Sequence, residues 1–129
     1  MSRSIALTTL VVDDYDRAID FYVRKLGFEV RQDVGLGEGK RWVVVQPVGS
    51  NSGLLLAKAQ GAEQVARIGN QAGGRVFLFL HTDDFARDYA RMTAVGVHFR
   101  ETPRQEPYGT VAVFEDLYGN GWDLIEPRA

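Results

Sequence analysis

Two side chains in this sequence are suited to acid–base chemistry. His81 ends an apolar run, and Asp123 lies between Trp122 and Leu124 near the C-terminus. A histidine titrates near neutral pH, and a carboxylate can share or accept its proton. His81 and Asp123 therefore form a candidate acid–base pair. Alternatively, His81 caps backbone groups at a strand end, and Asp123 makes a buried hydrogen bond to a neighbouring strand.

Aromatic residues form a second set, which is suited to lining a pocket for a flat or apolar ligand. Because side chains alternate along a strand, Phe77, Phe79 and His81 share one face. The same alternation points Trp122 away from Asp123, and we assign Trp122 to the core beneath a helix. Together with His81 and Asp123, the ligand-binding candidates are Phe77 and Phe79, with Trp42 and Tyr108 at the cavity or its mouth.

Composition narrows the classes of protein to consider. The 129 residues, 45% of them hydrophobic, suffice for one domain with a core. The net charge is −2, and the basic residues are scattered among acidic ones, so we expect no nucleic-acid partner. There are no cysteines, which excludes disulfides and thiolate chemistry. Two aspartates follow the apolar run 5–12, which therefore resembles neither a signal peptide nor a membrane span. We expect a cytoplasmic protein without a membrane partner.

The stretch 10–30 contains the signals for a strand, a helix and a second strand. The pair Asp13 and Asp14 supplies an N-cap oxygen and negative charge, so a helix should begin near Tyr15. Lys25 and Gly27 form a C-terminal signal. The helix should therefore pack its apolar side on a sheet that the flanking strands help to form.

This unit occurs twice, which determines the architecture that we predict. Asp13 and Asp14 are matched 70 residues later by Asp83 and Asp84, and Gly27 is matched 69 residues later by Gly96. Each copy reads as one strand, one helix and three strands. The expected strands are 5–12, 28–34, 41–47 and 54–58, then 76–82, 97–103, 110–116 and 122–126, with the second helix at 85–94, a loop at 104–109 and a turn at 117–120.

We therefore predict an α+β domain of two βαβββ modules. Module 1 covers about 1–58, a linker covers about 59–74, and module 2 covers about 75–129. In the first strand, alternation puts Leu7, Thr9 and Val11 on one face. We expect Leu7, Thr9, Phe77, Phe79 and Asp123 to line a common concavity, which adds Thr9 to the ligand-binding candidates.

The stretches DDYDRAIDFYVRKLGF and PYGTVAVFEDLYGNGWDLIEP resemble the vicinal oxygen chelate superfamily, the group of glyoxalase I, bleomycin-resistance proteins and extradiol dioxygenases. The resemblance covers nearly the whole chain. It implies that each βαβββ module curls its sheet into a half-barrel and that paired modules enclose a ligand cavity. It also implies a homodimer, which can cover open sheet faces and strand edges.

In the metal-dependent members, ligands come from the first and last strands of each module. On this resemblance, the ligand positions fall on Leu7, Leu55, Phe77 and Asp123, of which only Asp123 can bind a metal. We therefore predict no metal site and no cofactor.

Two functions follow from the resemblance. The first is a metal-independent protein that binds a small organic ligand in an aromatic-walled cavity, similar to the bleomycin-resistance type. The second is a glyoxalase-like lyase or isomerase, or a dioxygenase-related enzyme, that uses Asp123 with His81. The missing metal ligands favour the first.

Overall fold

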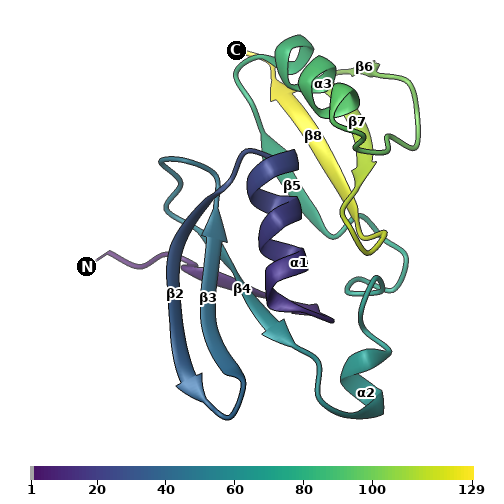
Figure 1. Ribbon diagram of the computed structural model, residues 1–129. Coiled ribbons are helices and arrows are strands. Elements are labelled where there is room, and N and C mark those ends of the chain that lie inside the picture. The colour runs from purple at the N-terminus through teal and green to yellow at the C-terminus, as the bar shows by residue number, and fades with distance from the viewer. Residues whose placement is uncertain (1) are drawn as a thin grey trace. The chain divides into compact units, whose positions relative to one another are not determined.

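Two four-stranded sheets with the same strand order form the framework of the computed structural model, which describes residues 2–129 (Figure 1). The order is β1-β4-β3-β2 in the first sheet and β5-β8-β7-β6 in the second. In each, the first and last strands of the repeat pair in parallel, and the other pairs are antiparallel. The predicted α+β fold of two βαβββ modules is confirmed.

The chain divides into two compact units, with the boundary between Ile68 and Gly69. The first unit contains β1 (Leu7–Val12), α1 (Tyr15–Asp20), the π-helix η1 (Phe21–Lys25), β2 (Glu29–Gly37), β3 (Lys40–Gln46), β4 (Gly53–Lys58) and α2 (Gly61–Val65). The second contains β5 (Leu78–His81), α3 (Phe85–Ala94), β6 (Arg104–Glu106), β7 (Gly109–Glu115) and β8 (Gly121–Pro127).

The aspartate pairs start the two long helices as predicted. The Asp14 carboxylate accepts a hydrogen bond from the backbone N–H of Arg17 at 2.8 Å. Asp84 does the same for Arg87 at 3.0 Å. In both copies this arginine also pairs with the first aspartate of its pair, so the repeat extends to side-chain contacts.

The second half of the first helix departs from the predicted regular helix. After Asp20 the chain continues as η1, where the Leu26 N–H bonds to the Phe21 carbonyl five residues earlier. Phe21 and Tyr22, which are adjacent, are both buried in this wider turn.

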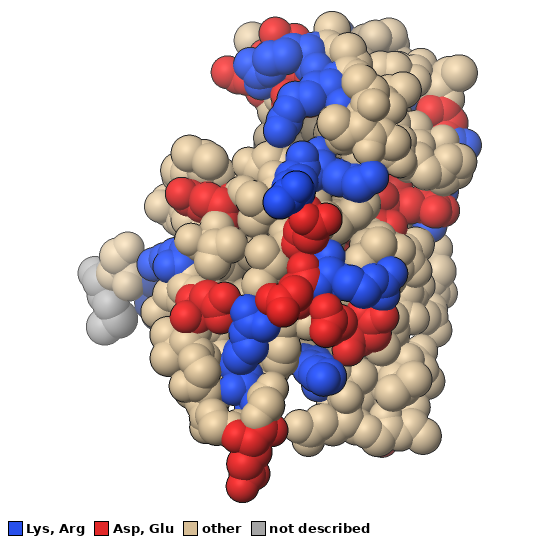
Figure 2. Space-filling view, viewed as in Figure 1, with Lys and Arg blue, Asp and Glu red and all other residues tan. Residues whose placement is uncertain are grey.

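Acidic and basic side chains lie beside one another along α1, as Figure 2 shows for this view of the molecule. Asp20 and Arg24 form one such ion pair at 2.8 Å. Since these charges are paired and exposed, they contribute little to stability. No helix among residues 2–129 is long and apolar enough to cross a membrane.

In the second unit, a chain of aromatic contacts joins α3 to one face of the sheet. The rings of Tyr89 on α3 and Phe99 lie 4.6 Å apart, and Phe99 contacts Phe114 at 5.7 Å. Phe114 in turn stacks on Trp122 with a centroid distance of 5.8 Å. This packing buries Trp122, as its alternation with Asp123 predicted, and leaves Asp123 on the opposite face.

The predicted strand 97–103 is wrong. It is reduced to an isolated bridge between Phe99 and Phe114, and the strand β6 lies where we expected a loop. The Glu101 carboxylate, rather than a backbone carbonyl, accepts the Val113 N–H at 3.2 Å, which interrupts the backbone ladder. Pro103 then offers no N–H with which to continue the ladder.

The strand β2 is exposed along all nine of its residues. It lies at the edge of the first sheet, and its pairing with β3 shifts register twice, between Val30 and Gln32 and between Gly35 and Gly37. Exposed apolar side chains on it include Val34 and Leu36. The homodimer expected from the sequence stays a prediction.

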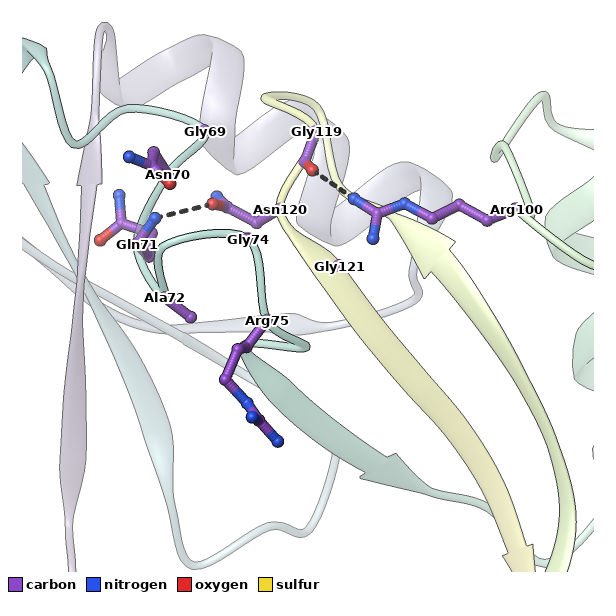
Figure 3. Close-up of a pocket in the computed structure, with 10 residues that line it drawn as sticks. All are labelled: Gly69, Asn70, Gln71, Ala72, Gly74, Arg75, Arg100, Gly119, Asn120 and Gly121. Atoms are coloured by element: carbon purple, nitrogen blue, oxygen red, sulfur yellow. Dashed lines mark hydrogen bonds between the residues drawn. The ribbon is translucent and has the colours of Figure 1, made fainter.

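The segment 69–75, which leads into β5, is held against the turn before β8 (Figure 3). The Gln71 N–H donates to the Asn120 side-chain oxygen at 3.3 Å. Asn120 is itself fixed, because its amide nitrogen donates to the buried Asp116 carboxylate at 3.0 Å. Asp116 also accepts hydrogen bonds from the backbone N–H groups of Tyr118 and Asn120, so its contacts hold the turn together.

Gly69 makes the closest approach in this contact. A Cβ atom on Gly69 would lie 2.4 Å from the Tyr118 carbonyl oxygen, and its φ is +77°. Gly73, in the same segment, has a similar φ of +64° but nothing within 4 Å of its Cβ position. An alanine at Gly73 would therefore bring backbone strain alone, whereas an alanine at Gly69 would bring strain and a steric clash.

We predict that Gly69→Ala lowers the free energy of unfolding by about 2–4 kcal/mol, because it combines strain with a backbone clash. Gly73→Ala should cost only about 1 kcal/mol, from the left-handed backbone alone. Urea unfolding of both variants measures the difference. Equal losses would show that segment 69–75 does not pack against the turn.

Candidate functional site

The site is built on the face of the second sheet that points away from α3, which we call the open face. Directly paired residues point to the same side of a sheet. The register puts Phe79 of β5 opposite Asp123 of β8, and Asp123 opposite Val113 of β7. The next row on the same face contains His81, Ile125, Val111 and Arg104.

A hollow opens on this face between the start of β5 and the middle of β8. Arg75, Val76, Phe79 and Asp123 line it. Phe79 is 61% exposed, whereas its neighbour Asp123 is only 7% exposed. The hollow therefore joins a large accessible ring to a nearly buried carboxylate.

The Asp123 carboxylate has an unusual environment for a charged group. Its Oδ1 atom is fully buried and has no hydrogen-bond partner within residues 2–129. Burial raises the pKa of Asp123; the positive charge of Arg104 opposes this rise, and the negative charge of Glu101 adds to it. An unsatisfied buried acceptor costs about 1–3 kcal/mol. The unpaired Oδ1 atom therefore lowers the stability of the folded state by about this amount.

Arg104 does not neutralise Asp123, because other carboxylates engage it. Its Nε donates to Glu101 at 2.9 Å, and its Nη1 lies 3.4 Å from a Glu106 oxygen. Nη1 also donates to the Tyr108 hydroxyl at 3.4 Å. Tyr108, a predicted ligand-binding residue, is half exposed and lies with this group at the β6–β7 turn.

His81 shares the open face with Asp123 but is not directly opposite it. The register pairs His81 with Ile125, one position further along β8. His81 is exposed, and no hydrogen bond joins it to Asp123 in the described chain. The acid–base pair therefore stays a prediction without a contact to support it.

Phe77 lies just before β5 and continues its pattern. Its N–H donates to the Gly121 carbonyl at 2.7 Å, and its side chain is half-buried. By alternation it points to the same side as Phe79. The sequence thus grouped Phe77, Phe79 and Asp123 on the face where the structure puts them.

The remaining predicted residues belong to the first unit, on the sheet face away from α1. Thr9 is exposed there, in the row that contains Leu55 and Val44. Trp42 is 37% exposed, and its Nε1 donates to the Gln32 side-chain oxygen at 3.1 Å. Thr9 and Trp42 therefore lie on the face of the first sheet that points away from α1.

The positions that the resemblance assigned to metal ligands hold few side chains that could bind a divalent ion. Leu7, Leu55 and Phe77 have no donor atoms, which leaves Asp123 alone. Nor do any three His, Asp or Glu side chains come together as a metal site among residues 2–129.

Sequence reasoning missed Arg75 and Val76, which lie in the hollow, and Glu101, which holds Arg104. Arg75 was predicted to begin module 2, directly after the linker 59–74, and Val76 to begin the strand 76–82. The Arg75 side chain points away from Asn120 (Figure 3), and Arg75 lines the hollow together with Phe79 and Asp123. No sequence pattern marks such a position.

A comparison of the sequence with known families identifies the class of protein. The sequence profile of the Glyoxalase/Bleomycin resistance protein/Dioxygenase superfamily matches residues 4–124. The repeated βαβββ sheets agree with the half-barrel fold of that group. The chain belongs to this superfamily.

Individual relatives span nearly the whole chain. An uncharacterised protein of Shewanella frigidimarina (strain NCIMB 400) is 61% identical, over 98% of this chain and 95% of its own. The crystal structure of UcmS2 is 33% identical with a TM-score of 0.85, covering 98% of this chain and 99% of its own. TnmS3, an antibiotic binding protein from Streptomyces sp. CB03234, is 31% identical with a TM-score of 0.79 and covers 98% of each chain.

The raised pKa of Asp123 predicts a pH-dependent stability. Between the unfolded pKa, about 3.9, and the higher folded pKa, the folded state binds more protons than the unfolded state. Stability should therefore fall as pH rises through this window. Asp123→Asn removes the titration, so the wild-type free energy of unfolding should fall relative to that of the variant as pH is raised from about 4.

Urea unfolding at a series of pH values measures this difference. Glu63→Gln, which removes an exposed carboxylate from α2, controls for the loss of one negative charge. Parallel curves for the wild type and Asp123→Asn would contradict burial of the Asp123 carboxylate.

Proposed function

We propose that this protein binds a small organic molecule at the hollow on the open face of the second sheet, without metal chemistry. One observation carries the proposal: an exposed aromatic ring lies beside a buried carboxylate that has no hydrogen-bond partner of its own. Such a combination of apolar surface and one polar group is typical of ligand sites.

The energetics favour an occupant. Covering the exposed part of the Phe79 ring would contribute about 1–2 kcal/mol. A ligand atom that donates to Asp123 would also recover the cost of its unsatisfied oxygen. Both gains arise at adjacent positions, so one small molecule can make both contacts.

The relatives support the same class of function. TnmS3 is described as an antibiotic binding protein, and the superfamily name includes bleomycin resistance proteins. Fold alone does not determine function, and the residues of the hollow therefore carry the proposal.

An enzyme remains the second candidate, because a raised carboxylate pKa also suits a general acid or base. In that alternative, a lyase, isomerase or dioxygenase relative uses Asp123 with His81 from the same face. His81 lies opposite Ile125 rather than Asp123, so a substrate would have to bridge the two groups.

Ligand binding is tested by screening aromatic compounds for a rise in melting temperature, followed by calorimetry on those that bind. A ligand at 100 times its Kd stabilises the folded state by about 2.7 kcal/mol. Phe79→Ala should weaken binding at least about tenfold, because the ring contact is lost. Val65→Ala removes an exposed apolar side chain from α2 and should leave the Kd unchanged.

Metal analysis separates the binder from a metal-dependent enzyme. One carboxylate and one imidazole hold a divalent ion too weakly to survive purification, so we predict no stoichiometric Zn, Ni, Mn or Fe. Excess metal should not raise the melting temperature, and EDTA should not change ligand affinity. Near one metal per chain, lost in Asp123→Ala, would show that the assigned ligand positions are wrong.

A further inference from the structure

We propose that the hollow selects a flat aromatic ligand whose edge carries paired N–H donors, of the amidinium type or of the 2-amino-azine type protonated on the ring nitrogen. The donors face the Asp123 carboxylate, and the ring plane covers Phe79. This inference rests on the proposed binding function and specifies the chemistry of the ligand.

The carboxylate sets the polarity of the ligand edge. Oδ1 of Asp123 has no donor within the described chain, and an ionised carboxylate can only accept hydrogen bonds. Two parallel N–H groups match the two oxygens of a carboxylate, as they do in arginine–carboxylate pairs. An acceptor edge or an anion would leave Oδ1 unsatisfied.

The charges around Asp123 favour the same type of edge. On this side of the open face, the carboxylates of Asp123, Glu101 and Glu106 outnumber the single guanidinium of Arg104, which already contacts the two glutamates. Arg75, which also lines the hollow, is exposed, so water screens its charge more strongly. A ligand edge that shares positive charge over its N–H groups therefore suits the buried carboxylate.

The shape of the hollow sets the body of the ligand. Phe79 offers a largely exposed ring directly beside Asp123, at the distance of a cross-strand pair. Val113 lies on the other side of Asp123, and Val76 lines the hollow near Phe79. A planar ring can therefore pack on Phe79 with its edge toward the carboxylate, while apolar side chains flank it.

Three probes with the same ring system test this inference: 2-aminoquinoline, quinoline and quinoline-2-carboxylate. Calorimetry on the full chain should show 2-aminoquinoline binding at least about tenfold more tightly than quinoline, because only it offers the donors. Quinoline-2-carboxylate should bind more weakly than quinoline.

Two variants assign the preference to Asp123. Asp123→Leu keeps the branched shape of the side chain and removes both acceptor oxygens, so the preference for 2-aminoquinoline over quinoline should fall below about threefold. Asp123→Asn is the second variant, which removes the charge but keeps one acceptor, and should give an intermediate preference. Phe79→Ala should weaken the binding of both heterocycles by similar factors.

The outcomes separate the two proposals. If quinoline-2-carboxylate binds most tightly, or Asp123→Leu keeps the preference, the donor inference is wrong. Binding that still depends on Phe79 would then leave the proposed function standing. If none of the three probes binds and the wider aromatic screen finds no ligand, both the inference and the proposed function are wrong.

Discussion

The parallel pairing of β5 with β8 is the constraint on which the site depends. It brings the first and last strands of the second module together, although more than 40 residues separate Phe79 from Asp123. Because paired side chains point to one side, this register puts the ring and the carboxylate next to each other. The aromatic packing of Trp122 and Phe114 under α3 then fixes which face of the sheet lies against the helix.

Much of this arrangement was predictable from local rules. The aspartate caps, the internal repeat and the alternation around Asp123 follow from spacing, and the structure confirms the fold that they predicted. Alternation also assigned Trp122 and Asp123 to opposite faces of the sheet correctly. This assignment depends on the register, since a one-residue slip in a strand would exchange the two faces. Ligand binding by the candidate residues, by contrast, does not follow from spacing or alternation, because it also depends on a second molecule.

Most of what sequence reasoning missed depends on hydrogen bonds between a side chain and a backbone N–H group far along the chain. Glu101 replaces a backbone acceptor for Val113, and this ended the predicted strand 97–103 early. Arg75 and Val76, which line the hollow, follow a segment in which Gln71 is tied to Asn120, 49 residues away. The π-helix that buries both Phe21 and Tyr22 likewise reflects the packing of large rings, which helical periodicity does not describe.

The irregular edge strand β2 has a consequence for how copies of the chain can meet. Its two register shifts and its charged residues, such as Arg31 and Asp33, disturb the regular row of backbone groups that another strand would need. Continuous sheet extension across molecules, the route to ordered aggregates, is therefore disfavoured at this edge. Contacts through β2 would have to use its side chains, including Val34 and Leu36, rather than its backbone.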